Sequence, residues 1–406
     1  MQSFGAFFVS VLAAGLATAA PAPSAPGATF SIPVVHNENH EANGVIAMAR
    51  AFNKFGKELP TELAEAVDRI LEARLQSRAQ GTVGAMPVPE GYDLEYLADV
   101  AIGTPPQKLK LNFDTGSSDL WVFSSETPSS QRNGHPYYTP TSSSSAKQLS
   151  GASWEVHYGD KSSSSGDVWI DKVTIGGLTV QQQAVENAKQ VSSQFVKGPQ
   201  QASGLLGLAS DNINTVKPQK QKTWFSNVKS QLDQKLFTAN LNHQTNGTYN
   251  FGFIDDSEHR GEIIYTKADT SRYWTFTSPN YQVGDRAVQT SVTGIADTGT
   301  SLLLLPDNVV NDYWSGVRSA KKDPNIANFI SYECSESIPD FYFGVENSKI
   351  HISADLINYG GAGGSRCFGG IQSSSGVGIN IYGDIAFKAA LVVFDDANSR
   401  LGFAQK

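Results

Sequence analysis

Apolar residues after Arg78 are grouped in short runs that are rich in β-branched and aromatic side chains. Glycine, proline, asparagine and serine separate these runs, as expected of strands that are joined by turns. The clearest predicted strands are residues 96–102, 109–113, 121–123, 168–175 and 249–253. Helical spacing of apolar residues is scarce, and its best candidates are residues 223–231 and 306–317. The pattern predicts an all-β protein.

The first twenty residues carry no charged side chain and contain an apolar stretch, residues 7–16, followed by a run of small residues that ends at Ala20. This arrangement predicts a secretory signal peptide over residues 1–19. A membrane anchor is the alternative, but it would need about 20 apolar residues, and no later stretch is long enough either. We therefore expect a secreted protein that does not enter a membrane, with a vacuolar destination left open.

Residues 20–80 differ from the rest of the chain. A linker rich in proline and alanine leads into a segment of mixed charge, in which Leu63, Val67, Ile70, Leu71 and Leu75 form one apolar stripe at helical spacing. Such a helix needs a surface to lie against. Its position between a secretory signal and a β-rich body predicts a removable pro-segment over residues 20–80, the alternative being an ordinary N-terminal helix of the mature domain.

Charge and cysteine content narrow the function classes. The chain has 31 Lys and Arg against 39 Asp and Glu, a net charge of -8, so it offers no basic surface to neutralise phosphates, and we expect no nucleic-acid partner. The two cysteines, Cys334 and Cys367, are too few for a zinc ribbon. One disulfide would close a loop of about 34 residues and contribute about 3 to 4 kcal/mol, whereas two buried free thiols are the alternative.

An internal repeat places two aspartates in equivalent positions. LKLNFDTGSSDLWV begins at Leu109 and VTGIADTGTSLLLL begins at Val292, so that Asp114 and Asp297 each follow a short apolar strand. Each copy is followed by two apolar residues and a glycine, at Gly207 and Gly383. The repeat predicts two similar lobes, residues 81–266 and 267–406, that face each other across a pseudo-two-fold axis and bring the two aspartates together.

Two neighbouring carboxyl groups have a specific chemistry. Because they cannot both ionise easily, they share one proton and titrate with separated pKa values. The singly protonated pair can act as a general base toward a water molecule and as a general acid toward a peptide bond. The paired carboxylates of glycoside hydrolases are an alternative, although those enzymes need no symmetric Asp-Thr-Gly loops. The signatures of serine and zinc hydrolases, G-x-S-x-G and H-E-x-x-H, are absent from the sequence.

Several motifs together resemble the pepsin-like aspartic proteases, and among them the secreted fungal subgroup, over residues 90–406. They are IGTPPQ from Ile102, FDTGSSDLWV from Phe113, WEVHYGD from Trp154, GLLGLA from Gly204, ADTGTSLLLLP from Ala296 and YGDIAF from Tyr382. The resemblance implies a bilobal all-β fold, an N-terminal pro-segment and hydrolysis of peptide bonds at acidic pH. It also implies extended protein or peptide substrates with bulky apolar residues around the cut, inhibition by pepstatin-type compounds, a monomeric enzyme and no metal or cofactor.

The same resemblance assigns roles to individual residues. Asp114 and Asp297 would be the catalytic pair. Five residues would support them: Thr115 and Thr298 by joining the two loops, Ser117 and Thr300 by hydrogen-bonding the outer carboxylate oxygens, and Trp121 by orienting a tyrosine. That tyrosine, Tyr158, would belong to a flap that closes over the cleft. The substrate-binding residues would be Gly116, Tyr158, Gly159, Asp160, Leu205 and Gly299, although Tyr158 could be an exposed strand residue and Leu205 part of the core.

Two lysines and one asparagine complete the expectations. Lys54 in Lys-Phe-Gly resembles the element with which zymogens of this family block the cleft, and would lie between the two aspartates; a solvated surface lysine is the alternative. Lys161 stands in the flap where the family has glycine, and we expect it to favour acidic or polar residues in the nearby subsite. Asn246 begins an Asn-Gly-Thr glycosylation sequon. A related fold that has lost catalysis and only binds peptides remains a competing interpretation.

Overall fold

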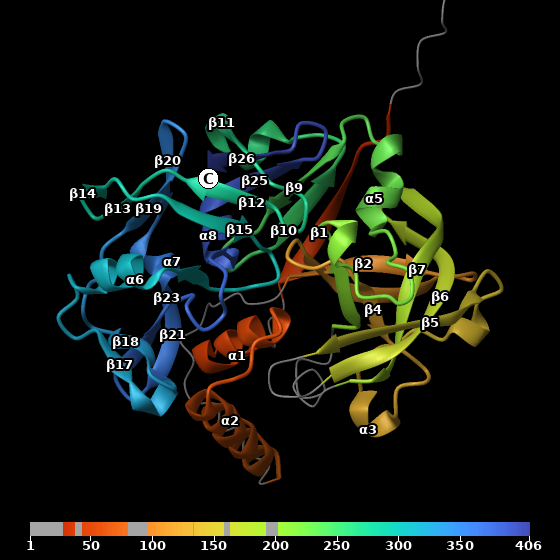
Figure 1. Ribbon diagram of the computed structural model, residues 1–406, viewed down its shortest axis with the longest axis horizontal. Helices are drawn as coiled ribbons and strands as arrows, with labels where there is room; N and C mark the ends of the chain where they lie inside the picture. The colour runs from red at the N-terminus through yellow and green to blue at the C-terminus, as the bar shows by residue number, and fades with distance from the viewer. Residues whose placement is uncertain (1–26, 37–42, 80–95, 133, 158–162, 192–201) are drawn as a thin grey trace, which may run out of the picture.

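The structure is a computed structural model that describes residues 27–36, 43–79, 96–132, 134–157, 163–191 and 202–406. Strands predominate, and they form two halves with short helices at their edges (Figure 1). The fold is mostly β and bilobal, as the sequence predicts. The flap residues Tyr158, Gly159, Asp160 and Lys161, the predicted signal peptide and the end of the predicted pro-segment lie outside the described residues.

The largest sheet has thirteen strands and contains almost all strands of the N-terminal half. Its order is β11 (Arg260–Lys267), β26 (Arg400–Gln405), β25 (Ala390–Asp395), β9 (Leu236–Asn240), β10 (Gly247–Phe251), β1 (Phe30–His36), β2 (Tyr96–Ile102), β3 (Gln107–Asp114), β8 (Gly204–Gly207), β4 (Leu120–Phe123), β7 (Leu178–Gln190), β6 (Ser163–Ile175) and β5 (Lys147–His157). The last two strands of the chain, β25 and β26, therefore cross the lobe boundary predicted at residue 266. The boundaries of the signal peptide, pro-segment and lobes stay predictions.

Three smaller sheets form the C-terminal half. The first has the order β12 (Thr275–Ser278), β15 (Val292–Ala296), β24 (Ile381–Tyr382), β16 (Leu303–Leu305) and β23 (Ile371–Ser373). The second has the order β14 (Arg286–Val288), β13 (Tyr281–Val283), β19 (Phe341–Val345) and β20 (Ser348–Ile352). The third has the order β17 (Lys321–Asp323), β18 (Phe329–Glu333), β22 (Arg366–Gly369) and β21 (Asn358–Gly363).

The internal repeat is a repeat of topology. Strand β3 pairs in parallel with β8, which pairs antiparallel with β4, and β15 pairs in parallel with β24, which pairs antiparallel with β16. The Leu-Leu-Gly and Ile-Tyr-Gly runs seen in the sequence are thus the partner strands of the two aspartate-bearing strands. Alternation along β3 directs Leu109, Leu111 and Phe113 into the core. This packing fixes where each strand ends and where its aspartate emerges.

The helices are short. They are α1 (Gly44–Lys54), α2 (Thr61–Ala79), α3 (Ser129–Arg132), α5 (Trp224–Val228), α6 (Asp307–Trp314), α7 (Ala354–Ile357) and α8 (Asp384–Ala389), with single 3-10 turns η1 (Pro140–Ser142), η2 (Asp211–Ile213), η3 (Lys229–Gln231), η4 (Asp256–Glu258) and η5 (Pro324–Ile326). The predicted helices at 223–231 and 306–317 correspond to α5 with η3 and to α6. Among the helices in the described part of the chain, none is long and apolar enough to cross a membrane.

The predicted pro-segment contributes one strand and two helices. Strand β1 is inserted between β10 and β2. Helix α1 lies between the two halves, and α2 extends away from it at the lower edge of the view (Figure 1). The predicted apolar stripe is buried at Leu63 and Val67 of α2 and partly buried at Ile70. The sequence predicted α2, whereas β1 and α1 were not expected.

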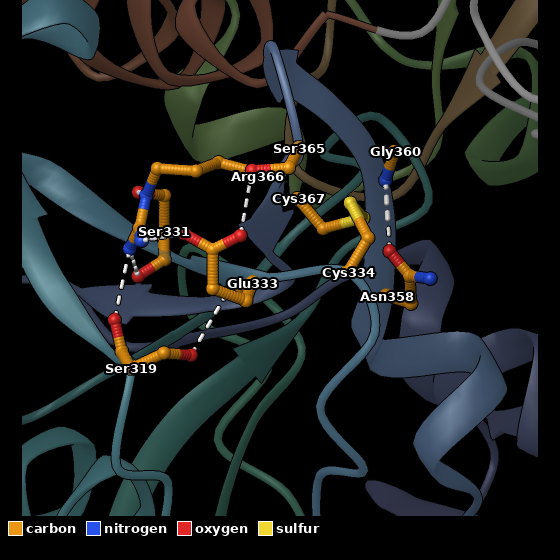
Figure 2. The surroundings of a disulfide bond; sticks show 9 residues. All are labelled: Ser319, Ser331, Glu333, Cys334, Asn358, Gly360, Ser365, Arg366 and Cys367. Carbon is orange, nitrogen blue, oxygen red and sulfur yellow. Dashed lines mark hydrogen bonds and ion pairs between the residues drawn. A yellow bond between two sulfur atoms is a disulfide. The ribbon is translucent and has the colours of Figure 1, made fainter.

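Cys334 and Cys367 form a disulfide, so they are not the two free thiols that the sequence left open. The bridge joins β22 to the residue that follows β18, its antiparallel neighbour. Figure 2 shows the Arg366 side chain extending away from the bridge, and its guanidinium donates hydrogen bonds to Glu333 Oε1 at 3.0 Å and to the Ser331 carbonyl oxygen at 2.6 Å. The covalent bridge and this ion pair hold the same two strands together.

Candidate active site

The two repeated aspartates lie at the ends of equivalent strands. Asp114 is the last residue of β3, and Asp297 follows the last residue of β15. Their side chains are almost fully buried, with 1% and 0% of their surface exposed. Since buried carboxyl groups are rare unless they are hydrogen-bonded or paired, each needs partners from the surrounding loops.

The two threonines that follow the aspartates join the loops across the interface. The Thr115 amide donates to Thr298 Oγ1 at 3.1 Å, and the Thr298 amide donates to Thr115 Oγ1 at 3.0 Å. Each hydroxyl also donates to a carbonyl oxygen of the opposite strand, Thr115 to Ala296 at 2.8 Å and Thr298 to Phe113 at 2.7 Å. Four buried hydrogen bonds therefore fix the relative position of the two loops.

Each carboxylate is oriented by its own loop in the same way. The Gly116 amide donates to Asp114 Oδ1 at 2.8 Å and the Gly299 amide to Asp297 Oδ1 at 2.9 Å. On the outer side, Ser117 Oγ donates to Asp114 Oδ2 at 2.6 Å. Thr300 Oγ1 donates to Asp297 Oδ2 at 2.7 Å. The hydrogen bonds leave both Oδ1 atoms on the side that faces the other aspartate.

The glycines of the two loops are required by this close approach. A Cβ atom on Gly116 would lie 2.5 Å from Asp297 Oδ1, and one on Gly299 would lie 2.3 Å from Asp114 Oδ1. Neither distance is tolerable for a side-chain carbon, so any other residue would push the two carboxyl groups apart. The Asp-Thr-Gly pattern is thus explained residue by residue by the geometry.

Lys54, the last residue of α1, lies between the two aspartates. Its Nζ donates to Asp114 Oδ1 and to Asp297 Oδ1, each at 2.6 Å, and its side chain is 14% exposed. The interpretation of Lys54 as a solvated surface lysine is therefore wrong. The ammonium group occupies the space between the carboxylates that a reacting molecule would need.

The three charges shift one another's pKa. Burial acts to raise the pKa of Asp114, but the Lys54 charge and hydrogen bonds from Lys54, Ser117 and Gly116 bring it below its usual value. Burial raises the pKa of Asp297, and the Asp114 charge adds to the rise against the pull of Lys54. Burial acts to lower the pKa of Lys54, but the two carboxylates raise it above its usual value. The two carboxyl groups therefore differ in proton affinity, and Asp114 ionises more easily than Asp297.

Two phenylalanines of the predicted pro-segment also contact the C-terminal half. The Phe52 ring packs against Gly376, where an added Cβ would lie 2.3 Å from the ring. The Phe55 ring makes an edge contact with Tyr273, with 5.9 Å between the ring centres. Beside the aspartates, a cavity of about 30 Å³ remains between α1 and the loops at Gly299 and Asp384. The side chains of α1 thus occupy apolar surface on the C-terminal half.

For the remaining predicted site residues, the structure shows where Trp121 and Leu205 lie and does not test their predicted roles. Trp121 of β4 is 4% exposed and stacks on Trp154 of β5, with 6.1 Å between the ring centres. Residues 158–162 connect β5 to β6 and lie outside the described residues, so the predicted contact with Tyr158 is not seen. Leu205 of β8 is half-buried beside the cluster that contains Trp121. The predicted roles of Trp121, Tyr158 and Leu205 stay predictions.

One buried acid beside the pair was missed. Asp384, at the first turn of α8, is 3% exposed, and its amide donates to the Thr300 carbonyl oxygen at 2.8 Å. Burial raises the pKa of Asp384 well above its usual value, Lys388 opposes this, and Asp297 adds to it. The YGD run was noted in the sequence as a motif, so the position of its aspartate directly after the second repeat's glycine was the signal that could have found it.

The carboxyl groups of Asp114 and Asp297 are placed so that both can exchange protons with one bound molecule. Two carboxyl groups of unequal proton affinity face each other, and their outer oxygens are held by hydroxyl donors. Such a pair can accept a proton from one group and donate one to another when a molecule replaces the ammonium group.

Comparisons with known proteins find one matching family and close relatives over most of the chain. The family model described as eukaryotic aspartyl protease matches residues 95–406. Endothiapepsin of Cryphonectria parasitica is 48% identical over 382 residues, which is 93% of this chain and 90% of that protein. Penicillopepsin-2 of Penicillium janthinellum is 44% identical over 405 residues, 98% of each chain. Aspergillopepsin-1 of Aspergillus pseudoglaucus is 44% identical over 358 residues, 88% of this chain and 87% of that protein.

Proposed function

The chain belongs to the eukaryotic aspartyl protease family and is an aspartic-type endopeptidase, and on this premise we propose that it is a secreted zymogen that cleaves proteins at acidic pH through Asp114 and Asp297. The observation that carries this proposal is the contact of one ammonium group with both aspartates at 2.6 Å. Two carboxyl groups that share one cation are close enough to share one proton and one water molecule once that cation leaves.

The reaction requires no covalent intermediate. The ionised carboxyl accepts a proton from a water molecule, whose oxygen attacks the carbonyl carbon of the peptide bond. The protonated carboxyl donates its proton to the carbonyl oxygen, and the resulting tetrahedral species loses the amine after a proton reaches the nitrogen. Ser117 and Thr300 donate to the outer oxygens and keep the inner oxygens turned toward the water molecule. The mechanism uses side chains of this protein alone and needs no metal or cofactor.

The substrate is an extended segment of a protein with bulky apolar residues around the cut. Gly116 and Gly299 leave room for the peptide backbone at the two loops, and Tyr158, Gly159 and Asp160 of the flap bind it from the other side, with Trp121 orienting Tyr158. Leu205 lines an apolar subsite. The packing of Phe52 and Phe55 beside the aspartates supports a preference for large apolar side chains, because the same surface becomes available when α1 leaves.

The pro-segment keeps the enzyme inactive until it reaches an acidic place. Acid protonates the carboxyl groups, the attraction to Lys54 weakens, and the segment is released for cleavage in the region of residues 78–83. The enzyme acts as a monomer and is inhibited by pepstatin-type compounds. Asn246 is exposed between β9 and β10, which supports glycosylation of its sequon during secretion.

The test is hydrolysis of casein or haemoglobin by the full chain after acidification to about pH 3 to 4, a range in which a carboxyl pair of this kind is singly protonated. We expect activity that pepstatin abolishes and that Asp114→Asn removes, whereas Asp99→Asn, an exposed aspartate of β2, leaves it unchanged. A correctly folded protein that shows no activity after loss of its pro-segment would instead favour a peptide-binding protein.

A further inference from the structure

A second pair of acidic side chains is buried in the N-terminal half, away from the space between the two aspartates. Asp119 follows Asp114 on the same loop, and Glu186 belongs to β7, where it is the register partner of Trp121 in β4. The two residues are 5% and 1% exposed. The mechanism proposed above uses neither of them, so their burial needs another explanation.

One amide group holds both carboxyls. Asn214 Nδ2 donates to Asp119 Oδ1 at 2.8 Å and to Glu186 Oε1 at 2.9 Å. Asp119 Oδ1 also accepts from the Thr215 amide at 2.8 Å. Within the described residues, Glu186 Oε2 receives no hydrogen bond although it is buried. Burial raises the pKa of Asp119, and the donors oppose this rise. Glu186 Oε2, which has no donor in the described part of the chain, is the atom left to carry a proton.

Among the described residues, no positive side chain would neutralise a second negative charge on Asp119 and Glu186. Neither carboxyl forms an ion pair with a lysine or arginine in the described part of the chain, and the further charge that acts on Asp119 is that of Asp114. On β7, the Lys189 ammonium pairs with Glu126 and Asp167. The lysines of the 211–222 segment are exposed, and one of them donates to the Asn212 carbonyl oxygen; they are Lys217, Lys220 and Lys222. Burial raises the pKa of Glu186 well above its usual value, and the Asp119 charge adds to the rise.

The pair is attached to the loop that carries Asp114. Asn214 Nδ2 also donates to the Ser118 carbonyl oxygen at 3.2 Å, and Ser118 Oγ donates to the Ser210 carbonyl oxygen at 2.6 Å. The Gly207 amide donates to the Asp119 carbonyl oxygen at 2.9 Å. The loop after Asp114 is thus held from three sides, by β8, by the 211–216 segment and, through Asn214, by β7.

We propose that Asp119 and Glu186 are positioning residues that share one proton and, through Asn214, hold the loop of Asp114 in the geometry that catalysis needs. This inference rests on the proposed role of Asp114. When the shared proton is lost to solvent, two negative charges lie side by side in a buried place, and the loop separates from β7. Loss of this proton therefore limits the activity of the enzyme at neutral pH. The effect does not involve Lys54.

The direction of the pH dependence follows from the raised proton affinity of Glu186 in the folded protein. A group of this kind stabilises the closed loop fully below its ordinary pKa, and the stabilisation is lost as the pH rises toward the folded value. In that window the equilibrium constant for loop opening increases by up to about tenfold per pH unit, because one proton is released on opening.

Hydrogen exchange of the full chain between about pH 5 and pH 8 tests the proposal, because this range lies above the ordinary carboxyl pKa and above the acidity at which the pro-segment is expected to leave. After correction for the intrinsic exchange rate, we expect the opening constant of residues 114–120 and 205–216 to rise with pH in the wild type. Glu186→Gln keeps a hydrogen-bond donor for Asp119 and cannot ionise. The slope of its opening constant against pH should therefore be smaller by the release of one proton. Its protection at acidic pH should equal that of the wild type. Glu262→Gln, an exposed glutamate of β11, should follow the wild type.

Two results would overturn the proposal: a Glu186→Gln slope equal to that of the wild type, or loss of protection in this variant already at the acidic end. If Glu186→Gln fails to fold, Asp119→Asn provides a second test: it removes the neighbouring charge, so the rise of the opening constant should begin at a similar pH and end at a lower pH than in the wild type, because burial alone still raises the pKa of Glu186. The readout is independent of hydrolysis, so a failed activity test would contradict the catalytic role of Asp114 and leave the exchange result valid. In the mature enzyme, Glu186→Gln should keep its kcat at higher pH than the wild type, with KM unchanged.

Discussion

A single ammonium group determines the state of the site in the intact chain. Lys54 contacts the inner oxygen of each aspartate, and the amides of Gly116 and Gly299 hold those oxygens in place. The ion pairs are buried, so their energy is not screened by solvent as it would be at the surface. Loss of one partner leaves the other charges buried without compensation, so this contact should be sensitive to substitution.

Lys54→Ala should destabilise the unprocessed chain by about 3–5 kcal/mol, because two buried carboxyls lose their cation. We expect poor secretion or premature processing, measured as the amount and length of the protein in the medium. Lys57→Ala removes an exposed lysine three residues later and serves as the control. Normal secretion of Lys54→Ala followed by maturation at the wild-type rate would contradict the assignment.

Acid should release the predicted pro-segment in the wild type, because the pKa shifts of Asp114 and Lys54 make their pairing weaker at low pH. The pKa of Asp114 is lowered in the folded chain, so its contribution is present above the ordinary value and is lost as the pH falls toward the folded value. The pKa of Lys54 is raised, so its contribution is lost only at high pH. The pairing is therefore intact at neutral pH and fails on the acidic side.

Lys161 is expected to influence which peptides the enzyme cleaves. It adds a positive charge beside the predicted flap residues, so peptides with an acidic or polar residue in the nearby subsite should be cleaved preferentially. We expect Lys161→Gly to reduce that preference in the cleavage profile of a peptide library, with the preference for apolar residues at the cut retained. An unchanged profile would show that Lys161 does not contribute to selectivity.

At the scale of elements, strand β1 links the predicted pro-segment to the body of the protein. It pairs with β10 through residues 30–34 and with β2 through residues 34–36, inside the thirteen-stranded sheet. Its residues alternate, so that Val34 is fully buried whereas Val35 is 41% exposed. Cleavage that removed β1 would open the sheet between β10 and β2, so we expect such processing to require a rearrangement of the N-terminal half.

Val34→Asp should destabilise the unprocessed chain by about 3 kcal/mol or more, because it buries an unpaired charge. Val35→Asp changes the neighbouring, exposed position and should alter stability by about 0.5 kcal/mol or less. The measurement is the urea midpoint of the unprocessed chain at neutral pH. Equal midpoints for the two variants would contradict the pairing of β1 in the sheet.

The sequence predicted some elements well and missed others for physical reasons. The strands at 96–102 and 109–113 and the helix α2 have strong period-2 or helical patterns, and the structure contains them. Strand β1 contains Pro33, which is unusual inside a sheet, and it follows a proline-rich linker, so its sequence alone does not predict a strand. Helix α1 carries apolar residues at helical spacing, at Val45, Met48, Ala49 and Phe52, after the N-cap residue Asn43. This local signal was sufficient to predict the helix and was missed.

At the scale of the whole molecule, the site depends on both halves. Each half provides one aspartate loop, and the hydrogen bonds of Thr115 and Thr298 cross between them. The repeat in the sequence was sufficient to predict that the two loops meet. The contacts of Glu186 and Asn214 could not be predicted, because these residues lie in different parts of the chain and carry no motif; only the fold brings them beside the loop of Asp114.

The central claim is that Asp114 and Asp297 act as one unit. The most direct test is the kcat/KM of Asp114→Asn, Asp297→Asn and the double variant, each matured through a cleavage site for an unrelated protease introduced near residue 80. Residues that act as a unit are not additive, so each single variant should lose as much activity as the double variant, on the order of 10³-fold or more. A single variant that keeps substantial activity, or a double variant whose loss is the product of the two single losses, would contradict the account.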